Sequence, residues 1–312
     1  MRAFVFPGQG SQAVGMGREL AEAFPAARHV FEEIDDALGK RLSKLVFDGP
    51  QSDLTLTENT QPALMTVSLA VIRVLEAEGG LKFGTLVSYV AGHSLGEYSA
   101  LAASGMLALA DTARLLQRRG RAMQEAVPVG VGAMAALLGA ELDAARALAA
   151  DAAEGEVCDV ANDNAPGQVV VSGHKTAVER AVKLAAERGM KRAIMLPVSA
   201  PFHCALMKPA AEVMAEALKS VSFAPTGVPH IANVSAEPVH EPSRARALLV
   251  EQITAMVRWR ESVSKMKALG VDTVVEIGAG KVLTGLNRRI EPELTTLSVL
   301  TPAEVEAFLK TL

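Results

Sequence analysis

Residues 86–96 read LVSYVAGHSLG, an apolar run that leads into a serine flanked by two glycines. The apolar run predicts a buried strand, and the small residues after Gly96 predict a helix. This context fits a G-x-S-x-G turn, in which Gly92 and Gly96 make room for a strained backbone that pushes the Ser94 hydroxyl outward. The N-terminal N–H groups of the following helix would lie near a developing oxyanion. The stretch predicts a nucleophilic serine. The simpler alternative is a glycine-rich turn with an incidental serine.

The composition indicates a folded protein with a large core. Of 312 residues, 50% are hydrophobic and 21% are charged, which is too apolar for a disordered chain. The 31 basic and 35 acidic residues give a net charge of −4, and no basic block favours nucleic acid as a partner. Cys158 and Cys204 are not spaced as metal ligands, so we predict that both are reduced thiols. We see no signal-peptide pattern and no membrane span, so we predict a soluble, cytoplasmic protein.

Strands and helices alternate in two stretches of the chain, residues 1–126 and 198–312. Apolar runs predict buried strands at 3–6, 86–91, 230–232 and 273–277. Helical patterns occupy 17–24, 26–38, 62–78, 111–126, 208–220, 243–257 and 282–290. The polar, threonine-rich residues 52–61 predict a loop. This alternation is typical of an α/β core with a parallel sheet covered by helices on both faces.

A different rhythm occupies residues 127–197. Predicted strands at 131–138, 157–161, 168–172 and 191–196 are combined with helices at 141–153 and 175–188, and residues 162–167 predict a turn. The order βαββαβ is that of a ferredoxin-like module. We therefore predict a small subdomain inserted into the larger one.

A serine nucleophile needs a base, because its hydroxyl scarcely ionises at neutral pH. Of six histidines, His203 ends a loop restricted by Pro197 and Pro201, which suits the presentation of a side chain. His93 stands inside the turn and should point away from Ser94. His203 is the candidate base, and a merely structural loop histidine is the alternative.

Residues 7–12, PGQGSQ, follow the first predicted strand. Their spacing is not G-x-G-x-x-G, and no acidic residue ends a second strand about 20 residues later, so we reject a dinucleotide loop. A loop around Gln9 that orients an oxyanion or a substrate fits better.

Arg118 and Arg119 lie on the helix after the serine turn, and arginines on a helix surface are usually solvated. Turned into a cleft, one of them could bind a carboxylate in bidentate fashion.

Together these segments resemble the malonyl-CoA:acyl-carrier-protein transacylase family. The resemblance rests on FPGQGSQ at 6–12, GHSLGEY at 92–98, Arg119-Gly120, QEAVP at 124–128, Val198-Ser199, Pro201, HCALMKP at 203–209, Asn233-Val234, Gln252 and GAGKVL at 278–283. The combination covers almost the whole chain in the family's order.

The resemblance implies a hydrolase-like α/β core with a ferredoxin-like insert. It also implies a ping-pong reaction. Ser94 would take the malonyl group from malonyl-CoA and pass it to the phosphopantetheine thiol of holo acyl carrier protein, with His203 as base. The backbone N–H groups of Gln9 and Leu95 would hold the oxyanion. No resident cofactor or metal is expected, because the coenzyme A thioester is a substrate.

The remaining roles concern substrate recognition. By resemblance, Arg119 would hold the malonyl carboxylate, a backbone carbonyl near Gln252 would support His203, and Asn233 would lie close by. Phe202 precedes the histidine where some related enzymes carry serine, and its bulk favours malonyl over methylmalonyl. Simple loop packing is the alternative for Phe202.

Two other functions stay open. A serine esterase or thioesterase would share Ser94 and could recruit Asp159 or Asp163 before His203. A non-catalytic module that docks carrier protein would carry a vestigial serine turn. Within the transferase interpretation we expect a monomer that supplies fatty-acid biosynthesis, with a stand-alone acyltransferase for polyketide synthesis as the alternative.

Overall fold

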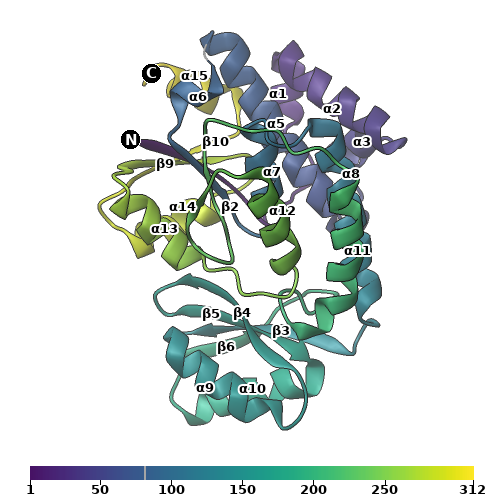
Figure 1. Ribbon diagram of the computed structural model, residues 1–312, viewed down its shortest axis with the longest axis vertical. Coiled ribbons are helices and arrows are strands. Elements are labelled where there is room, and N and C mark those ends of the chain that lie inside the picture. Colours follow the sequence, from purple (N-terminus) through teal and green to yellow (C-terminus); the bar gives the residue numbers. More distant parts are fainter. Residues whose placement is uncertain (81) are drawn as a thin grey trace.

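The computed structural model describes residues 1–80 and 82–312, which form two sheets, each with its own helices (Figure 1). The larger sheet has the order β10-β9-β1-β2-β7-β8. Its strands are β1 (Arg2–Phe6), β2 (Tyr89–Gly92), β7 (His230–Ile231), β8 (Pro238–Val239), β9 (Thr273–Ile277) and β10 (Thr295–Val299). All are parallel except the edge strand β8, which runs antiparallel to β7. The predicted parallel sheet is confirmed, with one antiparallel strand at its edge.

Helices cover both faces of the larger sheet. Strand β1 is apolar and buried on both of its faces, as a strand between two helical layers must be. Phe4 and Phe6 pack into the larger core cluster, and Ala3 and Val5 pack on the opposite face with Trp259. The helices are α1 (Arg18–Ala23), α2 (Pro25–Leu38), α3 (Leu42–Asp48), α4 (Gln51–Thr55), α5 (Thr57–Gly79), α6 (Phe83–Leu86), α7 (Leu95–Ala103), α8 (Leu109–Ala126), α11 (Lys208–Lys219), α12 (Pro242–Glu251), α13 (Trp259–Ala268), α14 (Val282–Ile290) and α15 (Pro302–Leu309). Helix α7 begins directly after β2 and its first turn contacts the carboxyl end of β1.

The smaller sheet lies at one end of the molecule, with α9 and α10 on its far side (Figure 1). Its elements are β3 (Gly132–Leu138), α9 (Leu142–Ala153), β4 (Cys158–Ala165), β5 (Gln168–His174), α10 (Lys175–Glu187) and β6 (Arg192–Met195). The antiparallel order β4-β5-β3-β6 is that of the predicted ferredoxin-like module. Ala133 and Ala135 of β3 pack under the two helices, whereas Met134 and Ala136 face the main core.

Three local predictions are wrong. Residues 52–61 form α4 and the first turn of α5, because their polar groups find partners within the fold. The Thr60 hydroxyl, for example, donates to the Leu54 carbonyl at 2.6 Å. The predicted turn at 162–167 is mostly strand, since β4 continues to Ala165, and the helix predicted for 243–257 ends at Glu251. No helix among the described residues is long and apolar enough to cross a membrane.

The first prediction concerns the contact between α7 and β1. A Cβ at Gly96 would lie 2.2 Å from the Phe6 carbonyl oxygen, a backbone atom that cannot move aside. We expect Gly96→Ala to lower the free energy of unfolding by at least about 3 kcal/mol, because overpacking against backbone has no side chain to repack. Urea unfolding measures this change.

Gly285→Ala is the matched control. This glycine lies within helix α14, and no atom lies within 4 Å of the position that a Cβ would take there, so alanine should raise the free energy of unfolding by roughly 0.5–1 kcal/mol. Equal stability changes in the two variants would contradict the close approach of α7 to β1.

Candidate active site

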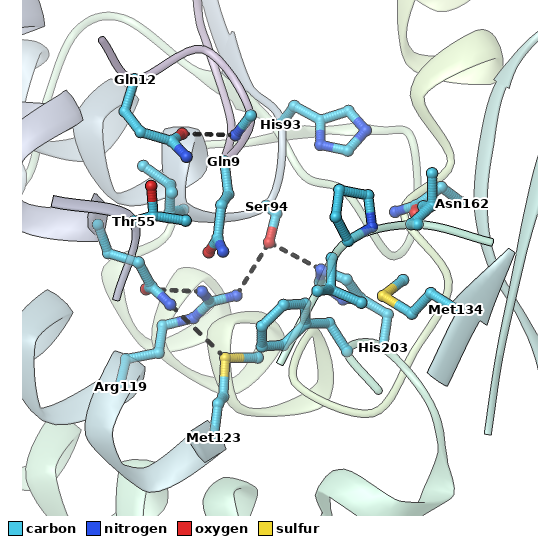
Figure 2. Close-up of a pocket in the computed structure, with 17 residues that line it drawn as sticks. Gln9, Gln12, Thr55, His93, Ser94, Arg119, Met123, Met134, Asn162 and His203 are labelled. Atoms are coloured by element: carbon cyan, nitrogen blue, oxygen red, sulfur yellow. Dashed lines mark hydrogen bonds between the residues drawn. The ribbon is translucent and has the colours of Figure 1, made fainter. Parts of the chain in front are cut away.

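Ser94 occupies a strained turn between β2 and α7. Its φ of 55° and ψ of −109° lie where a non-glycine residue is rarely found. The turn is tight because a Cβ at Gly92 would lie 1.9 Å from the Gly96 carbonyl carbon. Only glycine fits at these two positions. The hydroxyl of Ser94 consequently faces a cleft of about 430 Å³ (Figure 2).

His203 is placed to act on the Ser94 hydroxyl. Its Nε2 lies 2.7 Å from Ser94 Oγ, and its Nδ1 lies 2.9 Å from the Gln252 backbone oxygen (Figure 2 shows the first contact). Since a carbonyl oxygen only accepts, Nδ1 carries the proton and Nε2 accepts from the serine hydroxyl. Burial of the ring, and then the charge of Arg119, lower the pKa of His203 to about 3. The imidazole is therefore neutral at neutral pH and can serve as a general base.

Arg119 projects from α8 to the same hydroxyl and is 1% exposed. Its Nη2 donates to Ser94 Oγ at 3.1 Å and to Gln252 Oε1 at 2.8 Å, and its Nη1 donates to Gln61 Oε1 at 2.8 Å. The guanidinium carbon lies 5.5 Å from the Tyr98 ring centroid. Desolvation lowers the pKa of Arg119, while the nearby Tyr98 and Glu97 oppose that shift. All three of its hydrogen-bond acceptors are neutral groups, so the guanidinium could still pair with a carboxylate.

Asn233 and Gln252 brace the turn from behind. Asn233 Oδ1 accepts from the Ser94 N–H at 2.8 Å, and its Nδ2 donates to the Gly92 carbonyl at 2.7 Å. Gln252 Nε2 donates to the Ser94 carbonyl at 2.9 Å. Neither residue belongs to the described lining of the cleft, and both are 0% exposed. The geometry therefore makes them supports of the strained turn, and the substrate-binding role predicted for them from the sequence stays a prediction.

The cleft lies between the two sheets. Among its lining residues, Gln9 and Leu95 come from the core, Met134 and Asn162 come from the smaller sheet, and Phe202 flanks the histidine. Gln9 follows β1 and Leu95 begins α7, so the two residues meet at the carboxyl edge of the larger sheet. No hydrogen bond within the described residues uses either backbone N–H. Their role as oxyanion donors stays a prediction.

The two aspartates considered for a catalytic triad are engaged elsewhere. Asp159 Oδ2 accepts from the Ala205 N–H at 2.8 Å, and Asp163 Oδ2 accepts from Arg260 Nε at 2.9 Å. His203 Nδ1 is already bonded to the Gln252 carbonyl. The Ser-Asp-His arrangement expected for a hydrolase with Asp159 or Asp163 is therefore wrong for this chain.

Three buried polar residues around the site escaped the sequence analysis. Gln61 fell in the segment that we predicted as a loop, although it contacts Arg119. Glu97 and His230, each 1% exposed, form a pair behind Ser94 with Glu97 Oε1 3.2 Å from His230 Nε2. A charged residue in an otherwise small-residue, apolar helix was the one available signal for Glu97. His93 turns away as expected, with its Nε2 2.8 Å from Asn164 Oδ1.

A serine at a strand–helix turn that donates a hydrogen bond to a neutral histidine is typical of an α/β enzyme that works through a serine nucleophile. The family model described as acyl transferase domain matches residues 3–291, and the chain belongs to this family. It is 47% identical over 311 residues to the malonyl CoA-acyl carrier protein transacylase of Bacillus subtilis strain 168, covering 99% of this chain and 96% of that protein. The Escherichia coli K12 protein of the same name is 47% identical over 309 residues, with 99% and 98% coverage.

Solved structures agree with this assignment. The acyl-carrier-protein S-malonyltransferase of Bartonella henselae superposes with a TM-score of 0.97 at 55% identity, covering 99% of this chain and 98% of that one. A malonyl-transacylase solved in complex with its type II polyketide-synthase acyl-carrier protein gives a TM-score of 0.96 at 42% identity, with 100% and 99% coverage. The α/β fold with its inserted module is thereby confirmed.

The depressed pKa of His203 gives a second prediction. A fluorophosphonate should label Ser94 at a rate that stays level from pH 8 down to about pH 5, because burial disfavours the imidazolium and keeps the base neutral above its low pKa. Intact-mass spectrometry at timed points measures labelling, and circular dichroism checks folding at each pH. An acid limb near pH 6.5, the ordinary histidine value, would contradict a buried neutral base.

Proposed function

We propose that this chain transfers the malonyl group of malonyl-CoA to the phosphopantetheine thiol of holo acyl carrier protein. The observation that carries the proposal is Arg119, a buried guanidinium with only neutral hydrogen-bond acceptors, 3.1 Å from the nucleophilic hydroxyl. A substrate that places a carboxylate near the reacting carbonyl would complete that site. The names of the relatives supply the donor and the acceptor.

In the first half-reaction, Ser94 Oγ attacks the thioester carbonyl carbon and gives its proton to His203 Nε2. The backbone N–H groups of Gln9 and Leu95 are the proposed donors to the resulting oxyanion. The carbon–sulfur bond then breaks, coenzyme A leaves with the proton from His203, and a malonyl-serine ester remains. The Gln252 carbonyl keeps the His203 ring in the required tautomer throughout.

The second half-reaction reverses these steps with a different thiol. The phosphopantetheine thiol gives its proton to His203 and attacks the ester carbonyl. The bond to Ser94 Oγ breaks, and the serine recovers a proton from the histidine. Because the same groups act twice, the serine holds the malonyl group only between the two thiols.

Arg119 gives the proposed enzyme its acyl preference. A malonyl group would place its free carboxylate on the guanidinium, whereas an acetyl group would leave the buried charge without a partner. Losing one partner of a buried ion pair costs on the order of 3–5 kcal/mol. Selection between the two acyl groups could therefore reach several powers of ten.

The wider setting follows the same proposal. We favour supply of fatty-acid biosynthesis, and one solved relative serves a type II polyketide synthase instead. A monomeric state and a cytoplasmic location stay predictions. An esterase with the same serine would release malonate in the absence of carrier protein, so slow hydrolysis of the malonyl-serine ester distinguishes the transferase.

The third prediction tests nucleophile and acyl class together. Incubation with malonyl-CoA should add one malonyl group at Ser94, observed by intact-mass and peptide mass spectrometry, and Ser94→Ala should show no adduct. Arg119→Ala should lose malonyl loading by at least about 100-fold while gaining acetyl loading relative to malonyl. Unchanged malonyl loading in Arg119→Ala would refute the proposed carboxylate site.

The fourth prediction concerns Phe202, which lines the cleft next to the base. A smaller residue leaves space beside the α-carbon of the acyl group, so Phe202→Ser should raise methylmalonyl loading relative to malonyl by roughly 10-fold. Parallel loading with the two thioesters measures the ratio. Phe31→Ser, a core substitution on α2 away from the cleft, controls for loss of folded protein, and an equal change of ratio there would refute the role of Phe202.

A further inference from the structure

Glu97 is a carboxylate buried at the back of the site. It lies on the first turn of α7, three residues after Ser94, and is 1% exposed. Its Oε2 accepts from Gln252 Nε2 at 2.7 Å and from the Asn233 N–H at 3.2 Å. Its Oε1 lies 3.2 Å from Nε2 of the equally buried His230. The mechanism proposed above gives this carboxylate no part.

The carboxylate helps to determine which end of the Gln252 amide faces Arg119. An ionised carboxyl group can only accept hydrogen bonds, so it holds the NH₂ end of Gln252. The same NH₂ group also donates to the Ser94 carbonyl. The carbonyl end, Oε1, is thereby left for Arg119 Nη2 at 2.8 Å. If the amide turned over, its NH₂ group would face the guanidinium, and two donors would oppose each other.

Glu97 also influences the charge of Arg119. The negative charge of Glu97 favours the charged form of the Arg119 guanidinium. One amide group stands between carboxylate and guanidinium, so Glu97 supports the cation without pairing with it. A direct ion pair would satisfy Arg119 internally and would compete with a carboxylate of the substrate.

We propose that Glu97 is a positioning residue for acyl-group selection, which orients the Gln252 amide and so holds Arg119 ready for the carboxylate of the substrate. This inference rests on the proposed binding of that carboxylate by Arg119. His230 lies beside Oε1 of Glu97, the oxygen that does not contact Gln252. The selectivity for a malonyl group then depends on a chain of three residues, Glu97, Gln252 and Arg119.

The fifth prediction uses Glu97→Gln, which keeps the shape and removes the acceptor-only character. The new amide can donate to Gln252 and allow its side chain to turn over. We expect the ratio of kcat/KM for malonyl-CoA to kcat/KM for acetyl-CoA to fall by about tenfold or more, because only the malonyl group places a carboxylate on Arg119. A merely structural role would lower both values equally, and that result would overturn the proposal.

A swapped pair, Glu97→Gln with Gln252→Glu, provides the second variant. It retains one carboxylate, one amide and a hydrogen bond between them, but places the carboxylate directly against Arg119. We expect malonyl selectivity to be lost, because the carboxylate at position 252 pairs with Arg119. Malonyl selectivity at the unaltered level in the swapped protein would overturn the proposal, even if Glu97→Gln alone failed to fold.

Arg119→Ala in the same assays separates this inference from the proposed function. If Arg119→Ala kept the preference for malonyl-CoA, the carboxylate site itself would be refuted. If Arg119→Ala lost the preference while Glu97→Gln and the swapped pair kept it, only the role of Glu97 would fail.

Discussion

The contact of α7 with β1 and β2, where backbone meets backbone without side chains between, is the constraint on which the rest of the site depends. Gly92 and Gly96 allow it, and it forces Ser94 into a conformation that other surroundings would not hold. Asn233 holds this turn through the Ser94 N–H and the Gly92 carbonyl. The close packing at Gly92 and Gly96 and the hydrogen bonds of Asn233 therefore both maintain the strained conformation of Ser94.

Ser94, Gln9 and Asn233 lie close together because parallel strands bring their carboxyl ends to one edge of the sheet. Ser94 follows β2, Gln9 follows β1 and Asn233 follows β7. Arg119 comes from the helix that packs against α5, and His203 comes from the chain returning out of the smaller sheet. Each chemical group therefore lies on, or in a turn next to, an element of the folded core or of the smaller sheet.

Much of this arrangement could be predicted from the sequence, because the decisive features were local. The serine turn, the strand at 273–277, the first strand ending at Phe6 and the βαββαβ order each leave a pattern within a few residues. What could not be predicted depends on contacts across long separations. Glu97 and Gln252 are 155 residues apart, and no local pattern indicates which end of an amide faces which neighbour. For the same reason, Asp159 and Asp163 looked available to His203, although their real partners are the Ala205 N–H and Arg260.

Strand β4 of the inserted module touches the core close to both reacting side chains. Asp159 accepts a hydrogen bond from the N–H of Ala205, two residues after His203. Asn164 contacts the side chain of His93, the residue before Ser94. Between them, Asn162 bridges to Val257, five residues after Gln252. Exchange of residues 127–197 for a foreign domain of the same fold would therefore remove groups that bond to residues close to the nucleophile and to the base. A substitution along β4 can therefore alter contacts of the insert and of the core at the same time.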